Sequence, residues 1–294
     1  MPSPELLSSE LQRPELPAPH AAGFLSARAL LKNAWTLYRS RFWTLLGIVF
    51  IPLAVVLLLT SVFLALGEAA DNAIAWRMPL TKDIVLFGSV ILVWILAWFL
   101  QLWSELALLY ALKDAEEKIG IRESFSRGFA KILPYLWVTI LGGLLTLGSF
   151  LLFFLPGIVM LVWFFPALYV LVSENERGFR ALAKSKKYVE GYWLAVVWRL
   201  LLLAAIWIAA MAPFMILDIL TNIPDDWLDF LSAIPAIFLT PFATAYIYLL
   251  YRALKDAKGG EVAPTGRDKK ILVGIPMAGF LLVAAAVVLA ILFF

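Results

Sequence analysis

Long apolar runs alternate with short polar segments along most of this chain. Seven of the runs are long enough to cross a membrane as a helix, which takes about 20 apolar residues. The runs cover residues 42–67, 84–112, 133–154, 158–173, 192–217, 227–251 and 271–294. This pattern predicts an all-α, polytopic integral membrane helix bundle with about seven transmembrane helices.

The polar segments between these runs differ in charge. Of the 24 Lys and Arg residues, 21 lie in four segments, at 1–41, 113–131, 177–187 and 252–270. The connections that alternate with them hold two, none and none. Short loops rich in Lys and Arg stay cytoplasmic. The alternation therefore predicts a multi-pass membrane protein with its N-terminus in the cytoplasm and its C-terminus outside.

Three of the basic segments also have the period of an amphipathic helix. Residues 26–42 place an apolar stripe opposite basic side chains, and Ser26 is a fitting N-cap. Residues 122–132 and 177–193 repeat the pattern. A basic amphipathic helix ahead of a span is expected to lie in the plane of the lipid headgroups. The cations predicted to contact anionic headgroups are Arg28, Lys32, Arg39, Arg127, Lys131, Arg180, Lys184 and Lys187.

Each amphipathic segment is followed by two apolar runs, which suggests a threefold parallel repeat. The alternative is that basic, amphipathic stretches are common beside membrane spans and imply no repeat. The predicted organisation is a disordered cytoplasmic tail at 1–24, a six-span membrane domain at 25–254, a cytoplasmic linker at 255–270 and a seventh transmembrane helix at 271–294. The tail is rich in Pro and Glu and has no apolar core.

Composition narrows the classes of function. The chain is 63% hydrophobic and 15% charged, which excludes a soluble globular domain. It has no Cys, and its one histidine, His20, lies in a Pro-rich stretch where nothing would hold it in position. Phosphate-binding and nucleophile-elbow motifs are absent in any workable context. We therefore expect no enzyme, no metal and no cofactor. The net charge of +3 follows from the cytoplasmic segments and does not predict nucleic acid as a partner.

Two ionisable residues, Glu105 and Arg199, lie inside apolar runs. A charge near the bilayer centre costs about 2.5–3.5 kcal/mol on insertion scales. Each of these side chains is therefore expected to pair with another polar group or to reach the headgroup region. Both are expected about 10–12 Å from the cytoplasmic boundary. Arg199 could snorkel to the headgroups, pair with Glu105, or form a substrate or proton site with it. Gln101, one turn before Glu105 on the same face, favours a polar seam.

Four stretches resemble one membrane-domain family: AWTLYRSRFWTLLGI, LPGIVMLVWFFPALYVLVSE, ALAKSKKYVEGYW and TPFATAYIYLLYRAL. It is the glycerophosphoryl diester phosphodiesterase membrane-domain family, which also includes stand-alone YciC-like inner-membrane proteins. Its best motif, "ALxxSxxxxxGxxW", is matched by Ala181, Leu182, Ser185, Gly191 and Trp193. The chain departs from the family where Lys186 replaces an aromatic residue and where the Asp expected near Tyr251-Arg252 is missing.

The resemblance implies a multi-helix module of the bacterial cell (inner) membrane. It implies no activity for the module itself, because the phosphodiesterase chemistry belongs to a fused soluble domain. The leading hypothesis is thus a non-catalytic module that organises anionic membrane lipids, or a membrane or cytoplasmic protein partner, at the cytoplasmic leaflet. The alternative is a small secondary transporter or exporter with an intramembrane polar site at Glu105 and Arg199.

Overall fold

The computed structural model describes residues 25–71, 79–115, 117–220 and 225–293, which are helical with short connections and contain no strand. Seven helices are long and apolar enough to cross a membrane, as predicted. The predicted tail at 1–24 lies outside the described residues. The helices are α2 (Ala27–Ser40), α3 (Phe42–Asp71), α4 (Pro79–Lys113), α5 (Ile121–Phe129), α6 (Ile132–Leu152), α7 (Phe154–Phe164), α8 (Ala167–Glu174), α9 (Gly178–Val189), α10 (Trp193–Leu220), α11 (Asp225–Ala257) and α12 (Gly266–Phe293).

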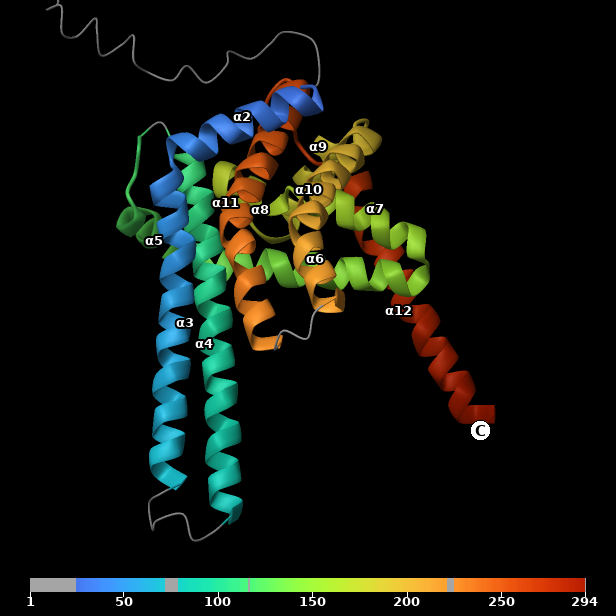
Figure 1. The fold of residues 1–294 in the computed structure, drawn as a ribbon. Coiled ribbons are helices and arrows are strands. Elements are labelled where there is room, and N and C mark those ends of the chain that lie inside the picture. The colour runs from blue at the N-terminus through green and yellow to red at the C-terminus, as the bar shows by residue number, and fades with distance from the viewer. Residues whose placement is uncertain (1–24, 72–78, 116, 221–224, 294) are drawn as a thin grey trace, which may run out of the picture.

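The three short amphipathic helices predicted ahead of span pairs are present as α2, α5 and α9. Ser26 caps α2 as expected, its side chain accepting a hydrogen bond from the Ala29 amide at 3.2 Å. The four buried residues of α2 form the predicted stripe: Leu30, Ala34, Leu37 and Tyr38. This stripe packs against α11, and α2 lies across the ends of α3, α4 and α11 (Figure 1).

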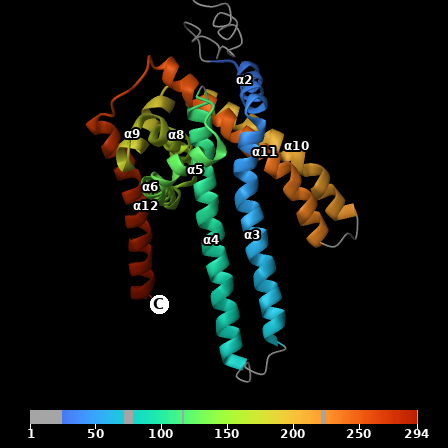
Figure 2. The same cartoon turned by 90° about the vertical axis from the view of Figure 1, so that its left-hand side faces the viewer.

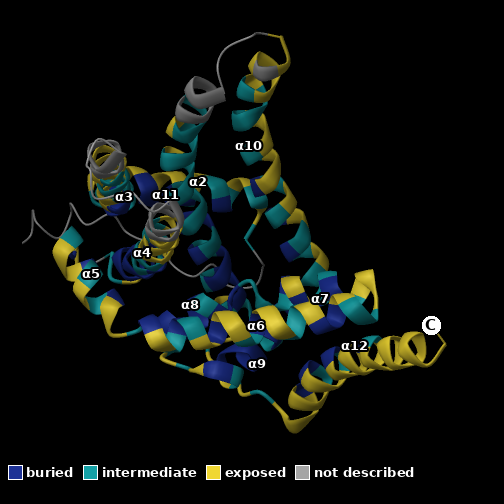
Figure 3. Cartoon of the chain, turned by 90° about the horizontal axis from the view of Figure 1, so that it is seen from below, coloured by how far each residue is buried: buried dark blue, intermediate teal, exposed yellow. Residues whose placement is uncertain are grey.

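We call the end of the bundle that carries α2, α5, α9 and residues 258–265 the basic end (Figures 1 and 2). The hydrophobic core is concentrated there. Residues 106–112 of α4 are all buried, whereas Leu92 and Trp94 on the opposite half of the same helix are exposed (Figure 3). A helix that is apolar all round and exposed along half its length is suited to a lipid surrounding.

The helices α6 and α7 are not oriented as a simple pair of spans. The axis of α6 lies roughly perpendicular to α3 and α4 in all three views (Figures 1, 2 and 3). The connection between α6 and α7 is short, and it does not lie at Pro156-Gly157, between the predicted runs 133–154 and 158–173. The break falls at the extended residue Phe153, and Pro156 lies in the first turn of α7, where the missing amide hydrogen has no helical acceptor to lose.

The last helix is an integrated part of the bundle. We predicted a linker at 255–270 and a seventh helix from 271, but α11 continues to Ala257 and α12 already begins at Gly266. The connection is therefore residues 258–265 only. Along its first half α12 packs against α6, and Leu272 is fully buried with Met160 of α7. This connection is shorter than the predicted linker, and within it Glu261 lies 3.4 Å from Lys184 of α9 and 3.7 Å from Lys255 of α11.

Candidate functional site

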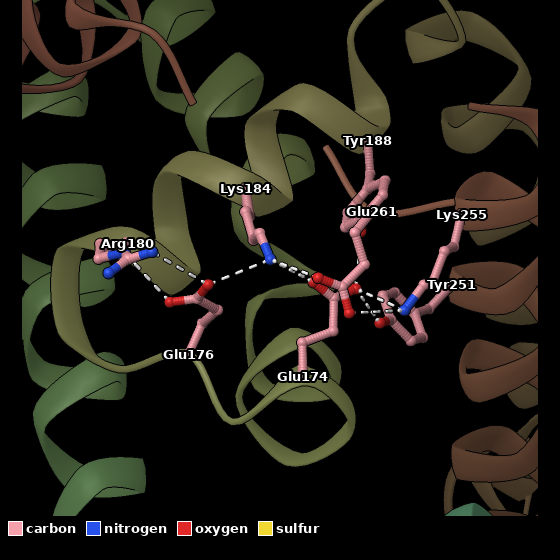
Figure 4. Close-up of polar contacts among 8 residues, drawn as sticks. All are labelled: Glu174, Glu176, Arg180, Lys184, Tyr188, Tyr251, Lys255 and Glu261. Carbon is pink, nitrogen blue, oxygen red and sulfur yellow. Dashed lines mark hydrogen bonds and ion pairs between the residues drawn. The ribbon is translucent and has the colours of Figure 1, made fainter. Parts of the chain in front are cut away.

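A buried charged cluster lies at the basic end, where α8, α9 and α11 meet (Figure 4). At its centre is Glu174, the last residue of α8, whose side chain is 0% exposed. One carboxylate oxygen, Oε2, accepts a hydrogen bond from Lys184 Nζ at 2.8 Å. The other, Oε1, accepts from the hydroxyls of Tyr188 at 2.6 Å and Tyr251 at 2.7 Å, and lies 3.1 Å from Lys255 Nζ.

The local backbone explains how a carboxylate reaches this position. Helix α8 ends because Asn175 adopts the left-handed conformation, with φ of 57°, which Asn tolerates better than most residues. The chain then reverses into α9, so Lys184 and Tyr188, one turn apart on α9, face back toward Glu174. A buried carboxylate without partners would be strongly unfavourable. Here two cations and two hydroxyl groups supply all of its hydrogen bonds.

The cluster is electrically balanced. Lys184 also lies 3.1 Å from Glu176 and 3.4 Å from Glu261. Burial alone would lower the pKa of Lys184, but the hydrogen bonds that its ammonium donates to Glu174 and Glu176 outweigh burial and raise that pKa. Arg180 completes the set through Glu176, so three carboxylates face three cations (Figure 4). An arrangement of this kind joins helices and leaves no net charge to attract a ligand.

A second buried ion pair joins α9 to α12. Lys186 Nζ lies 2.5 Å from Asp268, both side chains are 3% exposed, and the ammonium lies 5.1 Å from the centre of the Trp163 ring. Asp268 also accepts hydrogen bonds from the amide and hydroxyl of Thr265, the residue before the start of α12. Lys187 lies 3.5 Å from Asp268. The position where the resembled family has an aromatic residue therefore holds a lysine with a structural partner.

These contacts change the predicted set of lipid-contacting cations. Lys184 is buried among carboxylates and is not available to lipid, so that prediction is wrong. Lys187 lies 2.8 Å from Glu190, and Arg180 lies 3.2 Å from Glu176. Arg127 binds three carboxylates of the neighbouring segments. Its partners are Asp114, Glu117 and Glu123.

The basic face of α2 is different. Arg28, Lys32 and Arg39 are all exposed, and none has a carboxylate partner among the described residues. Their spacing of four and seven residues places them on one side of the helix, and Trp35 lies on the same side with 55% of its surface exposed. This face combines uncompensated positive charge with an aromatic side chain, whereas the opposite face of α2 is buried.

The intramembrane polar residues do not form the predicted pair. Glu105 on α4 accepts a hydrogen bond from the hydroxyl of Tyr135 on α6. Arg199 on α10 is 8% exposed and donates to the backbone oxygens of Leu25 and of Ala195, the latter at 2.8 Å. Gln101 is exposed on α4 and so does not extend a buried polar seam. Arg199 therefore reaches the segment before α2, as a snorkelling side chain would, and Glu105 belongs to a separate contact.

Sequence reasoning missed Glu174 and both buried ion pairs. Glu174 follows directly after the predicted run 158–173 and was not a candidate site residue, and its partners Lys255 and Tyr251 lie about 80 positions further on. A search of the described residues for groups of three or more His, Asp or Glu side chains suited to a metal finds none. Comparison with protein-family models, curated proteins and solved structures found no match to this chain. The family resemblance stays a prediction.

Proposed function

We propose that this chain is a non-catalytic membrane module that binds anionic lipid headgroups at the cytoplasmic leaflet through α2. The observation that carries the proposal is the exposed face of Arg28, Lys32 and Arg39, which has no compensating carboxylate among the described residues. Basic amphipathic helices beside spans bind anionic membrane surfaces. Trp35 on the same face favours the headgroup layer over bulk water, because indole side chains partition to that layer.

The orientation in the membrane belongs to the same proposal. All four basic segments have their described parts near the basic end, which the excess of Lys and Arg assigns to the cytoplasm (Figures 1 and 2). On this assignment α12 starts on the cytoplasmic side and runs away from it, so the C-terminus lies outside. The transporter alternative has less support, because Glu105 and Arg199 have different partners.

The expected strength follows from the charges. Each Lys or Arg near an anionic surface contributes about 1 kcal/mol. Three of them on α2 then contribute about 3 kcal/mol, which is roughly a hundredfold in retention. This contribution should weaken as salt shortens the screening length to about 3 Å at 1 M. Uncharged lipid should show no such preference.

The experiment uses the full chain in nanodiscs of phosphatidylcholine with phosphatidylglycerol, and counts retained lipids by native mass spectrometry. The test variant is Arg28→Gln/Lys32→Gln/Arg39→Gln. The matched control, Arg127→Gln/Arg180→Gln/Lys187→Gln, removes the same charge from residues that already have carboxylate partners. We expect the α2 variant to lose its preference for phosphatidylglycerol and the control to keep it. Equal losses would show that net charge, and not this face, retains the lipid.

A further inference from the structure

A second positively charged spot lies between the starts of α6 and α9, away from the exposed face of α2. The two helices are in contact with one another. A methyl group added at Gly178 would lie 3.1 Å from Trp137 and 3.9 Å from Leu141, and one added at Gly142 would lie 3.3 Å from Leu182. Residue numbers thus rise together along both helices, so their N-termini lie at the same end of this contact.

Both helix starts carry a cation at the capping position. The N-cap of α6 is Lys131 and that of α9 is Arg177, and neither side chain caps its own helix. The ammonium of Lys131 donates to the side-chain oxygen of Asn175, which ties the first turn of α6 to the loop before α9. Burial lowers the pKa of Lys131, and the positive charges of Arg177 and Lys113 lower it further. Three cations from three separate segments therefore act on one another.

Nothing among the described side chains neutralises them. Five described carboxylates lie in the adjoining segments, and each of them binds a cation other than Lys131, Arg177 and Lys113. Those between α8 and α9 bind Lys184, and those around the loop between α4 and α5 bind Arg127. The five are Asp114, Glu117, Glu123, Glu174 and Glu176. The spot therefore keeps its positive charge, although acidic residues are close in sequence on both sides.

Two further features indicate the kind of anion. The first amides of a helix have no acceptor within the helix and favour negative charge, so two parallel helix starts add to the charge of the side chains. Beside Lys131, Leu133 is 78% exposed and Trp137 is 57% exposed. An anion bound at this spot would lie beside apolar side chains that are suited to acyl chains.

We propose that Lys131 and Arg177, together with the starts of α6 and α9, bind the phosphate group of a membrane lipid, with Lys113 adding long-range attraction. Lys131 keeps donors free beyond the one directed at Asn175, and the guanidinium of Arg177 is able to bind two phosphate oxygens at once. The site shares no residue with the exposed face of α2, so the two proposals fail independently.

The test uses nanodiscs of phosphatidylcholine that contain a small fraction of phosphatidic acid, with retained lipid counted by native mass spectrometry. We expect wild-type protein to hold one phosphatidic acid tightly, and Lys131→Gln/Arg177→Gln to lose roughly tenfold to a hundredfold in retention. Lys118→Gln/Arg122→Gln is the matched control, because it removes two exposed cations of the neighbouring segment. The exchange Lys131→Arg/Arg177→Lys keeps both charges and should restore retention, which distinguishes lost binding from misfolding.

Competition with inorganic phosphate distinguishes a lipid phosphate group from free phosphate as the ligand. If the lipid is the ligand, millimolar inorganic phosphate leaves the retained phosphatidic acid in place. Displacement by inorganic phosphate would keep the phosphate chemistry but overturn the assignment to a lipid. The site itself is overturned if wild-type protein retains no phosphatidic acid, or if the control pair loses as much as the test pair.

Discussion

The charged cluster around Glu174 predicts a large loss of stability when that one carboxylate is neutralised. Glu174→Gln keeps the shape of the side chain and an oxygen that accepts hydrogen bonds, but removes the negative charge between Lys184 and Lys255. Because the site is buried, water does not replace the missing charge. The two ammonium groups then have too few carboxylates near them to balance their positive charge in this buried site.

The size of the loss follows from the contacts that remain. Removing one partner of a buried ion pair costs about 3–5 kcal/mol. Lys184 would keep Glu176 at 3.1 Å, and Lys255 would keep Glu261 at 3.7 Å. We therefore expect the lower end of that range, about 3 kcal/mol, which raises the ratio of unfolded to folded protein roughly a hundredfold.

The assay is reversible unfolding of the full chain in mixed micelles, followed by circular dichroism as the denaturing detergent is increased. Glu123→Gln is the matched control: Glu123 is 51% exposed and Arg127 keeps two other carboxylates, so we expect a loss below about 1 kcal/mol. Adding Lys184→Met to Glu174→Gln should recover part of the loss, since the unpaired charge is then removed. A loss for Glu174→Gln no larger than for Glu123→Gln would refute the reasoning.

Two further predictions concern α6, α7 and the start of α9. Gly178→Ala should destabilise the fold by about 1–2 kcal/mol in the same assay, because its φ of +54° is unfavourable for alanine and Trp137 lies 3.1 Å from the added methyl group. Gly143→Ala, with nothing within 4 Å, should be neutral or stabilising. The chain has no Cys, so single cysteines are informative. Cysteine at Phe153 should escape an impermeant maleimide added on the far side, and labelling of this cysteine would show that α6 and α7 cross like α3 and α4.

The parts of the fold that sequence predicted well depend on local periods. Apolar length gave the seven candidate spans, since hydrocarbon thickness fixes how many residues a spanning helix needs. The period of 3.6 gave the buried stripe of α2, and Ser26 marked its start. Each of these features depends on residues within about one helix, so contacts with residues distant in sequence did not change it.

The parts that sequence missed depend on distant contacts. Lys184 and Lys187 have the spacing of an exposed basic face, yet Lys184 is buried because Glu174, Glu176 and Glu261 surround it. The connection at 258–265 has the composition of a flexible linker, yet it lies between two buried ion pairs. Composition records which charges are present, but only the packing of α8, α9, α11 and α12 determines which of them neutralise one another.

The orientation of α6 and α7 shows why the charge pattern left this point open. A hairpin that crosses the membrane twice and one that lies across the bundle both return the chain to its starting side. The basic segments before and after it therefore stay together in either case, and the positive-inside rule is satisfied equally. Both arrangements also keep the backbone hydrogen bonds within helices, so neither exposes polar groups to lipid. Side-chain packing then decides between them: α6 lies against α12 where Gly148 faces Gly279, a contact too close for any side chain at either position, and beside α9 at Gly178. Contacts with α12 and α9 thus accompany the transverse position of α6, and the Lys186–Asp268 pair joins the first turn of α12 to α9.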